Sequence, residues 1–266
     1  MTQVRRVRLG HVERLLKTLS KRDLALLETL ALVRIASSSQ LERLYFHTLK
    51  PRSRSVKRGQ VLKRLVEARA VIPIERRIGT AGGGSDEQHY TLDSAGLRVL
   101  QLRARADGNS LLHRPRVPGD RFVSHTLAVT EAYVSLVELS RLGGFRLGAF
   151  VIEPRWPDGI GGFLAPDAYV DLEREGERYT WWFEADLGTE SLPTVQRKLA
   201  AYVEFVRRGQ VGPEGVVPWV LIGVATEGRQ RAVQQLVNRL PEPASYLFQV
   251  GLLTECTMLM AKELIS

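Results

Sequence analysis

The stretch PDAYVDLEREGERYTWWFEAD, residues 166–186, has the pattern of a β-hairpin. The segments 167–174 and 179–186 are its predicted strands, and Glu175-Gly176 is the predicted tight turn. Because side chains alternate along a strand, Glu184 and Asp186 are expected on one face. Asp167 opens the first strand, so the hairpin predicts three carboxylates near one of its ends.

The segments around this hairpin predict a mixed sheet flanked by helices. A helix over 122–139 and a strand over 145–152 come before it. After the hairpin we expect a helix over 193–208, a strand over 216–224, a helix over 228–240 and an apolar strand near 245–253. His125 and Glu131, in the first of these helices, either extend the carboxylate site or serve helix packing, and packing is favoured.

The charge of the chain changes near residue 120. Residues 1–120 carry 24 Lys and Arg against 11 Asp and Glu, whereas residues 121–266 carry 14 against 18. The net charges are therefore +13 and −4 within an overall charge of +9. A concentrated cationic segment attracts phosphate, and the counterions that it displaces from a duplex make binding favourable and salt-sensitive.

Three short helices are predicted in the basic half, beginning at Ser20, at residues 37–39 and after Pro51. The third one carries six cations: Arg52, Arg54, Lys57, Arg58, Lys63 and Arg64. A strand over 71–78, a glycine-rich tip at 79–85, a strand over 88–92 and a helix from 93 to about 105 follow, with Arg76 and Arg77 just before the tip. This order predicts a winged helix-turn-helix, whose third helix enters the major groove while the wing contacts backbone or minor groove.

The chain is therefore expected to have two domains in the α+β or α/β class. We expect a winged helix-turn-helix DNA-binding domain over 1–106, a linker over 107–120 and an α/β domain over 121–266. A basic helix face is often only solvated surface, and winged helices also bind proteins, so a protein-binding adaptor stays open. His47 and His89 are interpreted as ordinary surface or turn residues.

Composition excludes several other classes of protein. The one cysteine, Cys256, cannot form an internal disulfide, and with five scattered histidines it does not supply a zinc site. No apolar stretch is long enough to span a bilayer, and the first residues lack the apolar run of a signal peptide, so we expect a cytoplasmic protein with no membrane contact. No phosphate-binding Gly-Lys-Thr/Ser loop is present.

The three carboxylates Asp167, Glu184 and Asp186 are oxygen ligands of the kind that Mg²⁺ and Mn²⁺ prefer. Their spacing resembles the PD-(D/E)XK nuclease superfamily, whose core is a helix, a hairpin carrying Pro-Asp and then acid-Xaa-Lys, and a further helix. The resemblance covers residues 121–240 and implies a restriction-endonuclease-like domain with these acids as metal ligands and catalytic residues. Where that pattern has its lysine, this chain has Asp186, so Lys198 on the next helix is the candidate replacement. The alternative is that Glu184 and Asp186 are hydrogen-bonded structural acids.

Three further runs carry a resemblance to a family. They are FVSHTLAV at 122–129, FEADLGTES at 183–191 and KLAAY at 198–202. Together with the predicted winged helix, these runs resemble the replication-relaxation family of plasmids, phages and integrative elements. The resemblance implies a role in mobile-element replication, maintenance or transfer, without specifying a reaction.

The favoured hypothesis is a protein that binds double-stranded DNA without a cofactor and uses its second domain for homodimerisation or partner contact. The alternative from a different class is an Mg²⁺- or Mn²⁺-dependent nuclease or nickase, in which Lys198 would stabilise the phosphate transition state. Between the two, we favour a binding protein over an enzyme.

Overall fold

The computed structural model describes residues 8–74, 87–106 and 120–265. The chain forms two compact units, Met1–Thr130 and Glu131–Ser266. Their division falls inside helix α6, Asp120–Arg141, whereas the expected bounds are 1–106 and 121–266. The expected linker at 107–120 lies outside the described residues except for Asp120. The α+β class is confirmed, and none of the described helices is long and apolar enough to cross a membrane.

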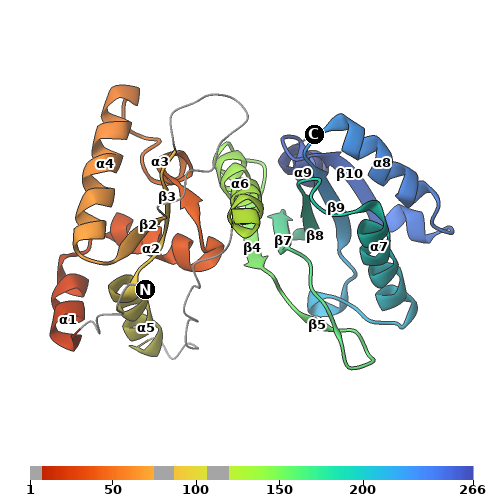
Figure 1. Cartoon of the computed structure of the whole chain (residues 1–266), viewed down its shortest axis with the longest axis horizontal. Helices are drawn as coiled ribbons and strands as arrows, with labels where there is room; N and C mark the ends of the chain where they lie inside the picture. The colour runs from red at the N-terminus through yellow and green to blue at the C-terminus, as the bar shows by residue number, and fades with distance from the viewer. Residues whose placement is uncertain (1–7, 75–86, 107–119, 266) are drawn as a thin grey trace. The chain divides into compact units, whose positions relative to one another are not determined.

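The first unit is built on five helices among its described residues (Figure 1). All but the first of them start within one residue of the predicted position. Ser20 and Asp23 exchange hydrogen bonds in a capping box at the start of α2, and Ser37 and Gln40 do the same at α3. Pro51 opens α4, where its missing N–H costs nothing. The five helices are α1, Leu9–Thr18; α2, Lys21–Val33; α3, Ser38–Tyr45; α4, Pro51–Glu67; and α5, Ser94–Ala106.

A small antiparallel sheet completes the first unit. Its strands are β1, Ala36–Ser37; β2, Val71–Ile74; and β3, His89–Leu92, in the spatial order β1-β3-β2. β2 and β3 pair antiparallel, with Val71 opposite Leu92 and Ile74 opposite His89. The predicted glycine-rich tip at 79–85, and with it Arg76 and Arg77, lies outside the described residues.

The first turns of α6 pack with the first unit. Val123 is buried together with Ile35 and Ile74, and the Thr130 hydroxyl donates to the backbone oxygen of Ile35 at 2.8 Å. The Gln40 side chain donates to the backbone oxygen of Leu127. These contacts explain why the compact unit extends to residue 130.

The second unit contains a mixed five-stranded sheet in the order β10-β9-β8-β7-β4. β7 pairs antiparallel with both β4 and β8, whereas β8, β9 and β10 run parallel to one another. Glu175 and Gly176 both have positive φ, as a tight two-residue hairpin turn requires. The strands are β4, Arg146–Ile152; β7, Ala168–Arg174; β8, Glu177–Asp186; β9, Trp219–Val224; and β10, Phe248–Leu252. A further hairpin, which the sequence analysis does not predict, consists of β5 at Trp156–Pro157 and β6 at Phe163–Leu164.

Helices cover both faces of this sheet (Figure 1). Trp182 of β8 packs against Tyr202 and Phe205 of α7, Leu192–Arg207, and α8, Glu227–Asn238, adds Val233 and Val237 to the same core. On the opposite face lies α9, Cys256–Ile265, which no sequence pattern predicts. Short 3-10 turns at Pro213–Gly215 and Ala244–Leu247 complete the unit.

Cys256 sits where α9 meets the sheet. A Cβ on Gly223 would lie 2.7 Å from its sulfur. Burial raises the pKa of the Cys256 thiol to about 12, so this thiol is a packing group.

One testable consequence concerns Gly96 of α5. A Cβ at this position would lie 2.1 Å from the backbone oxygen of Ala70, and backbone atoms move little. We expect Gly96→Ala to lower the free energy of unfolding by about 1–3 kcal/mol, measured by urea titration. The matched control is Gly59→Ala in α4, where an added Cβ would meet no atom within 4 Å apart from the backbone of its own helix. This change should stabilise the protein by about 0.5–1 kcal/mol. Equal effects at both positions would contradict the packing assignment.

A second consequence concerns His89, which was expected at the surface or in a turn. That expectation is wrong, because His89 lies in β3 and is 6% exposed. Burial lowers the pKa of His89 below its ordinary value of 6.5, an effect that the Glu87 carboxylate only partly offsets. Below pH 6.5 the unfolded chain therefore binds a proton that the folded chain does not, and the free energy of unfolding falls as the pH drops.

We expect His89→Gln to lose less stability than the wild type when the pH falls from 7.5 to 5.5, measured by urea titration at each pH. His47→Gln, at an exposed position, is the matched control. The same pH dependence in the His89 and His47 variants would argue against the assignment.

Candidate functional site

The predicted DNA-contacting cations of α4 lie on two sides of the helix. Its buried side carries Val61, Leu62 and Leu65. At about 3.6 residues per turn, Arg54 and Arg58 fall on this side. The other four cations fall on the opposite, exposed side: Arg52, Lys57, Lys63 and Arg64.

Arg54 and Arg58 have acceptors inside the protein. The Arg54 guanidinium donates to the backbone oxygens of His47 and Leu49, each at 2.7 Å. Arg58 donates to the Glu42 carboxylate at 2.6 Å. Arg54 therefore binds the segment between α3 and α4, and Arg58 joins α4 to α3 itself. Neither guanidinium can bind phosphate without breaking these bonds.

Arg64 is shared between the surface and the core. Its guanidinium pairs with the buried Asp23 carboxylate at 2.7 Å, yet 47% of the side chain is exposed. Burial alone would raise the pKa of Asp23, but hydrogen bonds from Arg64 and Ser20 outweigh it and lower the pKa. The pair thus joins α4 to the start of α2.

The remaining cations of the exposed side face solvent. Arg52, Lys57 and Lys63 are exposed and form no ion pair with any residue that the structure describes. Beside them lies an open depression lined by Arg22, Leu49, Arg52, Ser53, Val56, Lys57 and Gln60. We define the α4 surface as the half-buried Arg22 of α2 and six exposed residues of α4: Arg52, Ser53, Val56, Lys57, Gln60 and Lys63.

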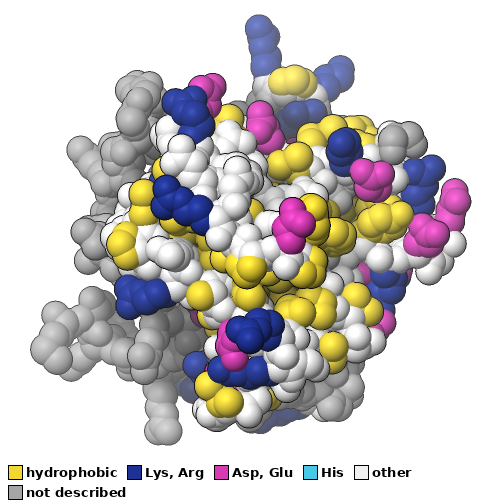
Figure 2. All heavy atoms as spheres, turned by 90° about the vertical axis from the view of Figure 1, so that its right-hand side faces the viewer, with side chains coloured by type: hydrophobic (Ala, Val, Ile, Leu, Met, Phe, Trp, Pro, Cys, Tyr) yellow, Lys and Arg dark blue, Asp and Glu magenta, His cyan; other side chains and the backbone are white. Residues whose placement is uncertain are grey.

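The second unit has a different surface charge. Figure 2 shows the side that carries α7 and α8, where basic and acidic side chains alternate with apolar patches. On the described part of this face no continuous cationic area forms. The net charge of −4 for residues 121–266 agrees with this mixture.

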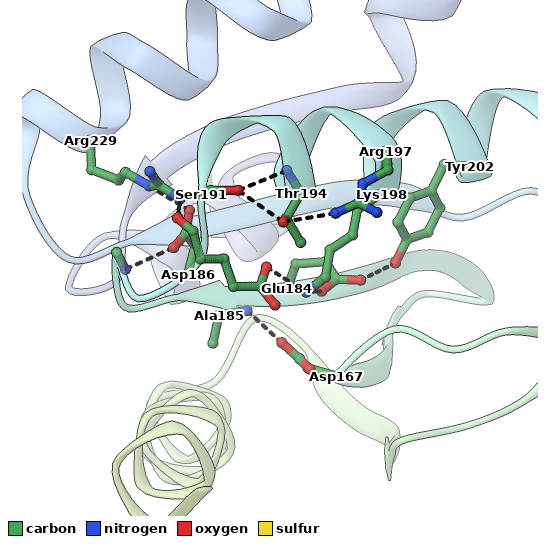
Figure 3. A network of polar contacts seen from close by, with 12 residues as sticks. Asp167, Glu184, Ala185, Asp186, Ser191, Thr194, Arg197, Lys198, Tyr202 and Arg229 are labelled. Carbon is green, nitrogen blue, oxygen red and sulfur yellow. Dashed lines mark hydrogen bonds and ion pairs between the residues drawn. The ribbon is translucent and has the colours of Figure 1, made fainter. Parts of the chain in front are cut away.

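A polar cluster lies between the end of β8 and α7 (Figure 3). Glu184 accepts a hydrogen bond from the Tyr202 hydroxyl at 2.5 Å and pairs with the Lys198 ammonium at 3.4 Å. Lys198 also pairs with Glu190 at 3.1 Å. The sequence-predicted Glu184 and Lys198 are therefore brought together, and Tyr202 joins them. A small pocket beside the cluster is lined by Glu184, Ala185, Asp186, Glu190, Val195, Lys198, Leu199, Tyr202 and Ile222.

Burial dominates the ionisation of this cluster. It raises the pKa of Glu184 to about 7, and the nearby Asp167 carboxylate adds to the increase, against the opposing effects of Lys198 and Tyr202. Burial also raises the pKa of Tyr202. For Lys198 burial acts downward, but Glu184, Asp167 and Glu190 together raise its pKa. Burial and the Asp167 carboxylate thus favour the protonated form of Glu184 more than water would.

Asp186 has a partner that the sequence did not reveal. Arg229 of α8 donates to its carboxylate at 2.8 Å and to the backbone oxygen of Glu190 at 2.8 Å. The backbone N–H of Gly188 donates to the other Asp186 oxygen. Arg229 lies 43 residues after Asp186 in the chain, and no local pattern links the two.

The three predicted metal ligands do not form one oxygen cage. Asp167 accepts from the backbone N–H of Ala185 at 2.8 Å, while Glu184 and Asp186 bind Lys198 and Arg229 (Figure 3). Within the described ranges, no three His, Cys, Asp or Glu side chains are placed to hold a metal ion. As these side chains lie, they do not fit Mg²⁺ or Mn²⁺. Glu131 contacts Ser135 in its own helix.

The family model described as replication-relaxation matches residues 27–220, which is more than half of the chain. The match includes α3, α4 and the β7–β8 hairpin with α7. The curated proteins include none that matches this chain.

The Asp186–Arg229 pair generates a prediction. Both side chains are largely buried, so removing one partner leaves an unpaired charge. We expect Arg229→Ala and Asp186→Ala each to destabilise the protein by about 3 kcal/mol, and the double variant by clearly less than the sum. Arg231→Ala, which removes an exposed partner of Glu227 on the same helix, should change stability by less than about 0.5 kcal/mol. Additive effects in chemical denaturation would show that the pair is not coupled.

Proposed function

Since the chain belongs to the replication-relaxation family, we propose that it binds double-stranded DNA through the α4 surface in the replication, maintenance or transfer of a mobile element. Membership of the family indicates a role in the replication or transfer of plasmids or other mobile elements. Duplex binding is the step that the geometry supports best.

The arrangement of the first unit supports a winged helix-turn-helix. α2, β1, α3 and α4 follow one another, and β2 and β3 then pair as the two strands of a hairpin. β1 pairs with β3, which attaches the helices to the hairpin. In this interpretation α4 is the helix that enters the major groove.

The observation that carries the proposal is the positive charge on the exposed side of α4, for which no described residue supplies an ion-pair partner. Arg52, Lys57 and Lys63 face solvent, and the one acid in α4, Glu67, stands at the far end of the helix. Holding such charges on one face costs electrostatic free energy, which a polyanion relieves. Each phosphate contact releases counterions and adds salt-sensitive affinity, and no cofactor is needed.

The second unit is proposed as the part that contacts a partner protein or a second copy of the chain. The order α6, three antiparallel strands, α7 and the parallel β9 supports a restriction-endonuclease-like core. Its catalytic positions would be Asp167, Glu184, Asp186 and Lys198. As they lie, these acids bind Lys198, Arg229 and backbone groups and do not fit a divalent ion.

The proposal predicts the behaviour of a triple variant, Arg52→Ala, Lys57→Ala and Lys63→Ala. Loss of three phosphate contacts should weaken binding to duplex fragments from the native locus by roughly tenfold or more at 0.1 M salt. The slope of log affinity against log salt should become shallower by roughly 2 to 3. Gel shift and fluorescence anisotropy over a salt series measure both quantities.

A matched control removes the same charge from the second unit: Arg207→Ala, Arg231→Ala and Arg239→Ala, all exposed. It should bind DNA nearly as the wild type does. Equal losses in the two triple variants would show that only net charge matters. If the wild type shifts no duplex at low salt and elutes early from heparin, the adaptor function replaces DNA binding.

A further inference from the structure

We propose that the α4 surface reads base sequence through Ser53, Val56 and Gln60, while the cations on either side of them bind the two phosphate backbones. The inference rests on the proposed duplex binding and adds that neutral side chains contact the bases while charged side chains contact the phosphates. It identifies the partner as a duplex with a preferred sequence that contains thymine and adenine at the positions facing Val56 and Gln60.

The helical repeat separates neutral from charged side chains. At about 100° per residue, positions 53, 56 and 60 fall in the middle of the exposed side of α4. Arg52 and Lys63 fall on one edge of that side, and Lys57 and Arg64 fall on the other. A helix in the major groove points its middle at base edges and its flanks at the phosphates of the two strands.

The three central side chains are available for contact. Val56 is 60% exposed, and Ser53 and Gln60 are exposed without a side-chain hydrogen bond to any described residue. All three line the open depression, together with Arg22, Arg52 and Lys57. The neutral centre is thus a shallow hollow bordered by positive charge, which allows a base edge to approach the helix.

The chemistry of these side chains matches particular bases. The methyl groups of Val56 suit the thymine methyl group, and the Gln60 amide can donate to adenine N7 and accept from its N6 amino group. The Ser53 hydroxyl can donate a hydrogen bond to an acceptor on a base edge or accept one from a donor. Val56 and Gln60 are four residues apart, about 6 Å along the helix, so their targets should be one or two base-pair steps apart.

The other side of α4 cannot take this role. Arg54 and Arg58, which suit guanine chemically, are held by the His47 and Leu49 oxygens and by Glu42. Val61, Leu62 and Leu65 are buried. The tertiary structure therefore leaves only the exposed side of α4 available to a duplex, with Ser53, Val56 and Gln60 in the middle of that side.

The experiment first selects the preferred duplex from a random library with the full-length wild type. Affinities are then measured for that duplex, for a scrambled duplex of the same composition, and for selected duplexes carrying single-atom changes. Uracil in place of thymine removes the methyl group, and 7-deazaadenine in place of adenine removes N7. Proteins are the wild type, Val56→Ala, Gln60→Ala and, as a backbone-contact control, Lys63→Ala. All three substituted positions are exposed, and circular dichroism checks that each variant folds.

We expect 7-deazaadenine at one adenine to lower the affinity of the wild type roughly tenfold, and to leave the affinity of the Gln60→Ala variant unchanged. Uracil at a neighbouring thymine should weaken the wild type severalfold and leave Val56→Ala unchanged. Lys63→Ala should weaken the selected and scrambled duplexes by the same factor, because phosphate contacts carry no sequence information.

The inference is overturned if the wild type binds DNA but selects no sequence, or if both variants respond to the modified bases as the wild type does. In those cases duplex binding through the cations still stands. Absence of binding to every library duplex at low salt removes the proposed function itself, so the two failures are distinguishable.

Discussion

The rotation of α4 about its own axis decides which of its side chains meet a partner, and several contacts fix that rotation. Val61, Leu62 and Leu65 bury one side of the helix in the core. Arg54 binds backbone oxygens of the segment between α3 and α4, and Arg58 binds Glu42 of α3. Since all these bonds lie on one side, the opposite side is left exposed with Arg52, Lys57 and Lys63. A turn of the helix by one residue would bury a charge and break these bonds, at a cost of several kcal/mol.

In the second unit, two acidic side chains are buried at the end of strand β8. Glu184 and Asp186 lie almost entirely out of solvent, where an unpaired carboxylate is costly. Lys198 and Tyr202 stabilise one acid and Arg229 stabilises the other. Lys198 and Arg229 thus offset part of the negative charge of the acids at this end of β8. The cluster also ties α7 and α8 to β8, so it contributes to the position of both helices.

Local signals in the sequence were sufficient for most elements of the fold. The caps at Ser20 and Ser37, the proline at residue 51 and the Glu175-Gly176 turn act through atoms a few residues apart, and each appears where expected. α1, β1, the β5–β6 hairpin and α9 were missed. The strands β1, β5 and β6 are two residues long, and α9 is held by packing against the sheet rather than by a strong start signal.

The sequence by itself determined the family, the α+β class, the concentration of positive charge before residue 121 and the placement of Glu184 and Asp186 on one face of a strand. Only the tertiary structure decided which cations are available and which acids are paired. Arg54 and Arg52 are alike in sequence, yet one binds backbone oxygens and the other faces water. Asp186 meets Arg229 because parallel strands bring α8 beside the end of β8. Pairing of this kind depends on distances across the fold, which neither composition nor periodicity encodes.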